Sequence, residues 1–291
     1  AVRALMTDLG GDSDNTFSAT AKAGAGAGKV GIAGALALNI LDTRSTAEIH
    51  GGALIDAEGG ELELRAESES VTTATALPDE PASGGKLGVG ASVALNLFRE
   101  EEVRARIRNG AELIDLDKLS VIANARSDTT AEAEAGAEGG VALDSVVALS
   151  ELKLQTEALV EAGAAISTTG AVNITATSAG EHVATASGDT ESSKVGIGAS
   201  GAIILSTTQT RASLERDLTT TGTDEDGALT VRAESSRSYE AVATASAAGG
   251  KAEDETTEAE RDKAASTSTL KDNKDAQEGT ETTKKDNKLA I

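Results

Sequence analysis

The chain lacks cysteine and has almost no aromatic residues. With no cysteine in 291 residues, it forms neither disulfide bonds nor the usual cysteine-containing zinc sites. Phe17, Phe98 and Tyr239 are its aromatic residues, and it has no tryptophan. A compact enzyme of this length normally fills a thick core with aromatic side chains. The composition therefore predicts a thin core built from alanine, valine, leucine and isoleucine.

Basic residues are scarce as well. The 26 lysines and arginines face 48 aspartates and glutamates, which gives a formal net charge of −22. This balance opposes nucleic acid and anionic membranes as partners, because both bind through basic surfaces. No run of about 18 apolar residues is present, so we expect no membrane insertion. The chain begins with Ala1 rather than methionine, and we expect a mature piece or a fragment of a longer polypeptide.

What the sequence does have is a repeat. Similar segments lie at 29–40, 86–97, 140–150 and 194–205, and they begin 54 to 57 residues apart. A fixed period of this size is typical of repeat architectures. Each copy alternates large and small side chains with period 2, which predicts a β-strand.

The two faces of this repeated strand differ. One face carries large aliphatic residues, and the other carries glycine, alanine and serine. The pattern leaves open whether the small side chains permit close approach of another layer or form a flat outer wall. One hypothesis is lateral assembly of several chains through the small face, at positions such as Ala35 and Ala94.

A glycine turn and a second strand follow each copy. Gly52, Gly110 and Gly163 are expected to adopt positive φ, and Asp217 stands at the same place in the last copy. The strands at 61–68, 118–125, 171–178 and 228–235 alternate apolar and polar residues, so we expect them to be half buried. We expect one shared internal column formed by Leu62, Leu119, Val172 and Leu229.

These signals divide the chain into repeat units and an acidic segment. Within 1–251 the units are approximately 19–70, 71–130, 131–182 and 183–240, with the start of a fifth at 241. Residues 252–287 hold 11 acidic and 6 basic side chains, and they lack the aliphatic residues needed for a core. This segment is either an insertion in the fifth repeat or a disordered terminus. In the first case, 288–291 resumes the next strand.

The predicted fold is all-β. About 55 residues fit two rungs of roughly 27 residues, stacked about 4.8 Å apart in a parallel β-helix, or β-solenoid. A set of small β-sandwiches is the rival, but such domains usually need about 100 residues.

The repeat motifs resemble a known family. The pattern Gly-Ala-x-Leu/Ile…Gly-x-Leu-x-Leu/Val-x-Ala at 52–66 and 163–176 is similar to filamentous haemagglutinin-like adhesin repeats. The Lys-Val-Gly-Ile-Gly-Ala-Ser strand resembles repeats of giant leukotoxin-like filamentous adhesins of bacteria. The resemblance covers 19–251. It implies a right-handed parallel β-helix, export by a two-partner or autotransporter route, and an extracellular or bacterial cell-surface location.

The resemblance also implies a function and partners. We expect a structural segment of a filamentous adhesin or fibre that contacts a host or neighbouring cell surface, carbohydrate or matrix. Self-association into filaments is a further option. The alternatives are a carbohydrate-active β-helix enzyme of the polysaccharide lyase type and a β-helix of the phage tail-fibre type.

Residues that would support catalysis are few. His50 and His182 occupy different repeat positions, and we interpret both as surface histidines. Arg104, Arg106 and Arg108 form the one candidate cluster for an acidic polysaccharide, but nearby glutamates favour a charge-balanced solvated face. The sequence therefore predicts no enzyme and no catalytic or cofactor-binding residue.

Two acidic turns and one asparagine pair complete the candidates. Calcium is the one ion considered, at 12–15 and at Asp224 and Asp226, but neither turn has a recognised calcium-site spacing, so we assign no metal site. Asn39 and Asn96 recur at one repeat position, which predicts a partial asparagine stack with a structural role.

Overall fold

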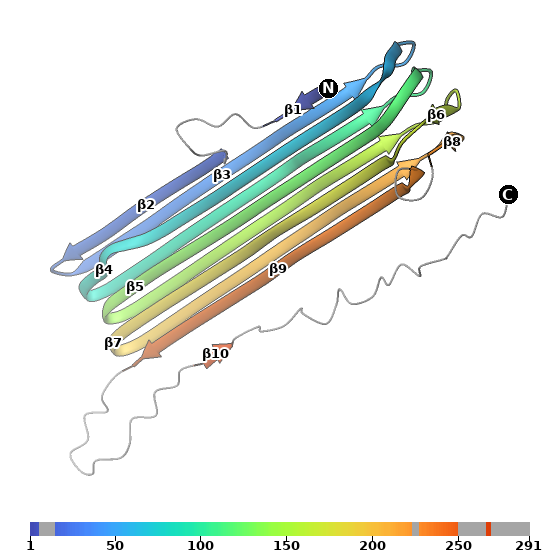
Figure 1. Cartoon of the computed structure of the whole chain (residues 1–291). Coiled ribbons are helices and arrows are strands. Elements are labelled where there is room, and N and C mark those ends of the chain that lie inside the picture. Colours follow the sequence, from blue (N-terminus) through green and yellow to red (C-terminus); the bar gives the residue numbers. More distant parts are fainter. Residues whose placement is uncertain (6–14, 223–226, 250–265, 269–291) are drawn as a thin grey trace.

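A computed structural model describes residues 1–5, 15–222, 227–249 and 266–268 (Figure 1). Over these residues the protein is all-β and contains no α-helix. The strands are β1 (Val2–Ala4), β2 (Asn15–Ala27), β3 (Val30–Ile49), β4 (Leu54–Ile107), β5 (Glu112–Val160), β6 (Ile166–Thr168), β7 (Val172–Leu214), β8 (Leu218–Thr220), β9 (Leu229–Ala248) and β10 (Ser266–Ser268).

The strands pair one repeat with the next. The order is β1-β4-β5-β7-β9-β10, with β2 and β3 also on β4, and every pairing is parallel except that of β10 with β9. Leu62 pairs with Leu119, Leu119 with Val172, and Val172 with Leu229, so the predicted column is confirmed.

The expected division of each repeat into two rungs is wrong. All parallel partners lie 52 to 62 residues apart, which is one whole repeat. One repeat is therefore one coil, made of two long extended legs joined at a sharp bend (Figure 1). We call 15–27, 61–84, 118–139, 172–192 and 229–248 the first legs. The second legs are 30–49, 87–107, 141–160 and 195–214.

The two legs of a coil lie face to face. Their inner side chains form three buried clusters, and the one nearest the bend consists almost wholly of alanine. Ala35 and Ala37 of a second leg pack there with Ala74 and Ala76 of a first leg. At one end larger aliphatic residues such as Leu64 and Ile107 fill the space, and both are fully buried. The expected thin core of small and aliphatic residues is thus observed.

The small-residue face of the second leg points into this core. A Cβ atom added to Gly88 would lie 2.3 Å from the carbonyl oxygen of Ala82 on the opposite leg. Even the methyl group of alanine therefore fits poorly at Gly88. Ala35 and Ala94 are 7% and 0% exposed, so the hypothesis of lateral assembly through this face is wrong. The two layers use the small side chains to approach each other closely.

The glycine turns between coils are confirmed in part. Gly52 and Gly110 have φ of +81°, as expected for tight turns. Gly163 and Asp217 do not have positive φ, so that prediction is wrong for them. Gly163 instead lies under the guanidinium of Arg216, whose Cζ would be 3.0 Å from an added Cβ.

Two predicted segments fall largely outside the described residues. Of the acidic stretch 252–287, the structure describes only Ser266–Ser268, which forms β10 beside β9. Residues 288–291 also lie outside the described part of the chain.

Candidate functional site

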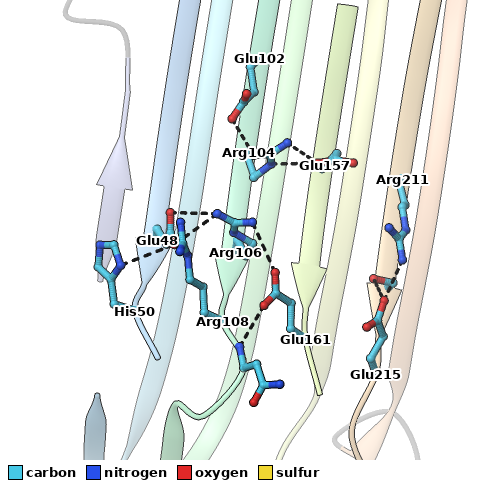
Figure 2. A network of polar contacts seen from close by, with 12 residues as sticks. Glu48, His50, Glu102, Arg104, Arg106, Arg108, Glu157, Glu161, Arg211 and Glu215 are labelled. Atoms are coloured by element: carbon cyan, nitrogen blue, oxygen red, sulfur yellow. Dashed lines mark hydrogen bonds and ion pairs between the residues drawn. The ribbon is translucent and has the colours of Figure 1, made fainter. Parts of the chain in front are cut away.

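Of the arginine row predicted as a candidate cluster, Arg104 and Arg106 lie on the outer face of β4, and Arg108 directly follows that strand. Arg104 contacts Glu102 on its own strand, with Nη1 2.9 Å from Oε1. It also contacts Glu157 of β5, with Nη2 2.7 Å from Oε2 (Figure 2). The register places Arg104 opposite Glu157 and Glu157 opposite Arg211. Opposite charges therefore alternate from coil to coil at this position.

The rest of the row is paired in the same way. Arg106 lies 3.4 Å from Glu48 of β3 and 3.4 Å from Glu161, just beyond β5, so it links three coils (Figure 2). Arg108 also contacts Glu48. His50 lies 3.7 Å from the same carboxylate, and its side chain is 75% exposed, as expected for a surface histidine.

These contacts confirm the charge-balanced face. The side chains of Arg104 and Arg106 are only 20% and 18% exposed, because carboxylates cover them. An acidic polysaccharide would have to displace these carboxylates before it reached the guanidinium groups. The cluster can stabilise the stacking of coils, but it presents little free positive charge.

A second set of polar side chains is enclosed between the legs. Glu101 is 2% exposed, and its Oε1 accepts hydrogen bonds from Ser68 at 3.2 Å and Ser70 at 3.3 Å. Burial raises the pKa of Glu101, and these hydrogen bonds together with the charge of Arg237 offset part of that effect.

His182 belongs to this enclosed set, so its interpretation as a surface histidine is wrong. Its side chain is fully buried and stacks on Tyr239, with ring centroids 5.1 Å apart. The Nδ1 atom lies 3.1 Å from Thr129 Oγ1, and Arg237 donates to Nε2 at 3.1 Å. Burial, followed by the charge of Arg237, lowers the pKa of His182 to about 4. A substrate in solution does not reach this ring.

The asparagine pair joins the two layers. Asn39 donates from Nδ2 to Asn96 Oδ1 at 3.0 Å and to the carbonyl of Thr73 at 2.8 Å. Asn96 repeats the second contact with the carbonyl of Thr130 at 2.7 Å. The predicted partial stack is confirmed, and each amide also bridges to the opposite leg.

The candidate calcium turns cannot be placed. Asp12 and Asp14, like Asp224 and Asp226, lie outside the described residues. Among the described residues, no group of three or more histidine or acidic side chains has an arrangement that could hold a metal ion.

The large aliphatic side chains of the second legs point outward. We call this surface the aliphatic wall. Its residues form five columns across four coils, and those in the first and last of these coils are mostly between 41% and 67% exposed. The columns are Val30/Leu87/Val141/Val195, Ile32/Val89/Leu143/Ile197, Leu36/Val93/Val147/Gly201, Leu38/Leu95/Leu149/Ile203 and Ile40/Leu97/Glu151/Leu205.

A hollow near Ala33, Pro78 and Ala91 has a cavity volume of only about 10 Å³. Pockets for small organic ligands usually measure about 300–1,000 Å³. This hollow is therefore too small to bind a sugar unit in an enclosed manner.

Comparison with known proteins gives no match to a family model, to a curated protein or to a solved structure. The part of the chain that the structure describes also has no helix long and apolar enough to cross a membrane.

Proposed function

We propose that this chain is a structural segment of a filamentous adhesin or fibre, located on a bacterial cell surface or secreted. In this proposal the coils form a right-handed parallel β-helix, or β-solenoid, of the filamentous haemagglutinin-like and leukotoxin-like type. The observation that carries the proposal is the continuous parallel pairing of each repeat with the next.

Because each repeat pairs with the next in the same way, the number of coils can vary without a change in the fold. Each coil offers backbone donors and acceptors to the following one, and every added coil extends the stack by about 4.8 Å. Stability is then a sum of contacts between neighbouring coils, as in other repeat proteins. This property suits a fibre, in which the repeated unit is the functional element.

The outer contacts support a structural role. Ion pairs such as Arg104–Glu157 connect neighbouring coils. Among the enclosed polar groups, Ser68 donates to Glu101 across the legs, and Thr129 contacts His182 of the next coil. We therefore propose a non-catalytic protein whose partners are host or neighbouring cell surfaces, carbohydrate or matrix. Incubation with acidic polysaccharides should yield no unsaturated products, and their formation would favour a lyase instead.

Surface labelling tests the proposed location. Antibodies raised against the full chain should label intact cells that produce it, or the fibres that these cells release. Labelling that requires permeabilised cells would contradict the proposal. Beads coated with the chain should also adhere to matrix or to cells more strongly than beads coated with an unrelated acidic protein.

A further inference from the structure

The aliphatic wall is an unpartnered surface made mostly of large aliphatic side chains. Large aliphatic residues occupy 18 of the 20 positions in its five columns, and Gly201 and Glu151 are the exceptions. A column of small residues, Gly34/Ala91/Ser145/Ala199, lies on the same face between the Ile32 and Leu36 columns. Ile32 and Leu36 are 67% and 61% exposed. A soluble chain rarely leaves a contiguous apolar patch larger than a few hundred Å² uncovered.

The opposite outer face of the same coils has different chemistry. There the first legs carry ion pairs such as Lys118–Glu61 at 3.0 Å and Arg3–Glu63 at 3.0 Å. Neighbouring outward positions hold threonine, as at Thr75 and Thr185. The first legs thus have a polar, charged outer face, whereas the outer face of the second legs is aliphatic over the wall and charged beyond it, where Arg104 and Glu157 lie.

We propose that two copies of this chain pack wall to wall in a symmetric dimer. The inference goes beyond the fibre role and does not depend on it. Packed sheets lie about 10 Å apart when their side chains interdigitate. Both walls have ridges at the spacing of the coils, so a second copy fits the first without a new surface shape.

The size of the wall matches a stable interface. A strand of 11 residues is about 36 Å long, and four coils are about 19 Å wide. The wall therefore covers roughly 700 Å² per copy, or about 1,400 Å² for a pair, within the usual 1,200–2,000 Å² of specific interfaces.

Charge and composition favour a second copy over other occupants. A net charge of −22 opposes an anionic membrane surface. The acidic segment 252–287 has Leu270 as its one large aliphatic residue and lacks the side chains to cover the wall. In the wall-to-wall dimer, the charged outer faces of the first legs of both copies point to solvent, which disfavours addition of further copies through those faces.

The test is the mass of the full chain in solution, measured by analytical ultracentrifugation. The sedimentation of the wild-type chain should give a molecular mass twice that of a single chain of 29.1 kDa. A variant with Leu95→Glu and Ile203→Glu should dissociate, with a dissociation constant raised about 100-fold or more, because carboxylates would be buried without partners. The matched control, Thr75→Glu with Thr185→Glu, adds the same charge to the same two coils on the polar face and should remain dimeric.

Circular dichroism of both variants should retain the strand spectrum, which separates loss of the dimer from loss of the fold. A monomeric wild-type chain at about 100 μM, a dimeric wall variant, or a wild-type chain that grows into open assemblies would overturn the proposal. Binding of the wild-type monomer to neutral lipid vesicles would assign the wall to lipid instead.

Discussion

Arg237 donates a hydrogen bond from Nη1 to Nε2 of His182, at 3.1 Å, inside the coil. Because a guanidinium can only donate, Nε2 accepts, and the single ring proton resides on Nδ1, facing Thr129 Oγ1. This arrangement holds the imidazole neutral. Asp128 favours the charged form, but burial and the charge of Arg237 outweigh it and lower the pKa of His182 to about 4.

The buried histidine predicts a loss of stability in mild acid. The unfolded chain binds the proton near pH 6.5, whereas the folded chain binds it only near pH 4. As the pH falls from about 6.5 to about 4, the unfolded state therefore gains protons first. Linkage gives a loss of about 2 kcal/mol between pH 7 and pH 5 from this one group.

Urea unfolding of His182→Gln and of His50→Gln at both pH values measures this contribution. The His182 variant should lose the pH-dependent decrease, whereas the exposed His50 is the matched control and its variant should retain it. An unchanged pH dependence in His182→Gln would contradict the neutral, buried assignment.

The buried carboxyl of Asp144 affects the pH dependence of stability in the opposite direction to His182. It is 4% exposed on the inner face of β5, and burial raises the pKa of its carboxyl from 3.8 to about 6. At pH 7 its charge therefore destabilises the fold, and Asp144→Asn should increase the free energy of unfolding by about 1–3 kcal/mol. The gain should decline as the pH falls from about 6 towards 3.8, because the wild-type carboxyl then takes up its proton. Asp42→Asn, at a side chain 59% exposed, should change stability by less than about 0.5 kcal/mol.

Leu119 lies in the internal column, so truncating its side chain measures how much the column contributes to the free energy of unfolding. It is fully buried between Leu62 and Val172, so Leu119→Ala should reduce the free energy of unfolding by about 2–5 kcal/mol. Leu229 occupies the same column on β9 but is 49% exposed, so Leu229→Ala should cost less than half as much. Equal losses for the two variants, measured by urea denaturation, would contradict the stacking.

The two legs of a coil approach each other closely at Gly88, and a substitution there tests this contact. Its added Cβ would lie 2.2 Å from the carbonyl oxygen of Glu138 and 2.3 Å from that of Ala82. Gly88→Ala should therefore destabilise by several kcal/mol, since backbone atoms must move. At Gly34, which points outward, the nearest atom is the carbonyl oxygen of Ala91 at 3.7 Å. Gly34→Ala should be neutral or stabilise by up to about 1 kcal/mol. Thermal unfolding of the two variants distinguishes the cases.

The sequence predicted the alternation of faces but not which face is buried. Leucine and isoleucine usually point inward, yet here Ile32 and Leu38 point to solvent. The reason is the separation of the legs, which is a property of two segments together. The close contact between Gly88 and Ala82 could not be inferred from the pattern of one strand.

The number of coils per repeat was missed for a related reason. A strand pattern reports the direction of side chains, and it contains no signal that a leg continues straight for about twenty residues before it bends. His182 was missed because a single histidine carries no sign of burial. The repeat spacing was the one signal of its position, because it places Thr129, His182 and Tyr239 at equivalent points of successive coils.

The pairing of whole repeats is the central claim, and a disulfide test measures it most directly in this cysteine-free chain. Ile122 lies beside Thr175 on the outer face of the first legs, whereas Leu149, half a repeat from Ile122, lies on the opposite outer face. The account predicts that Ile122→Cys with Thr175→Cys oxidises to an intramolecular disulfide, detected by mass spectrometry at low protein concentration. It also predicts that Ile122→Cys with Leu149→Cys does not. A disulfide in the second variant and none in the first would show rungs of half a repeat and would contradict the coil described above.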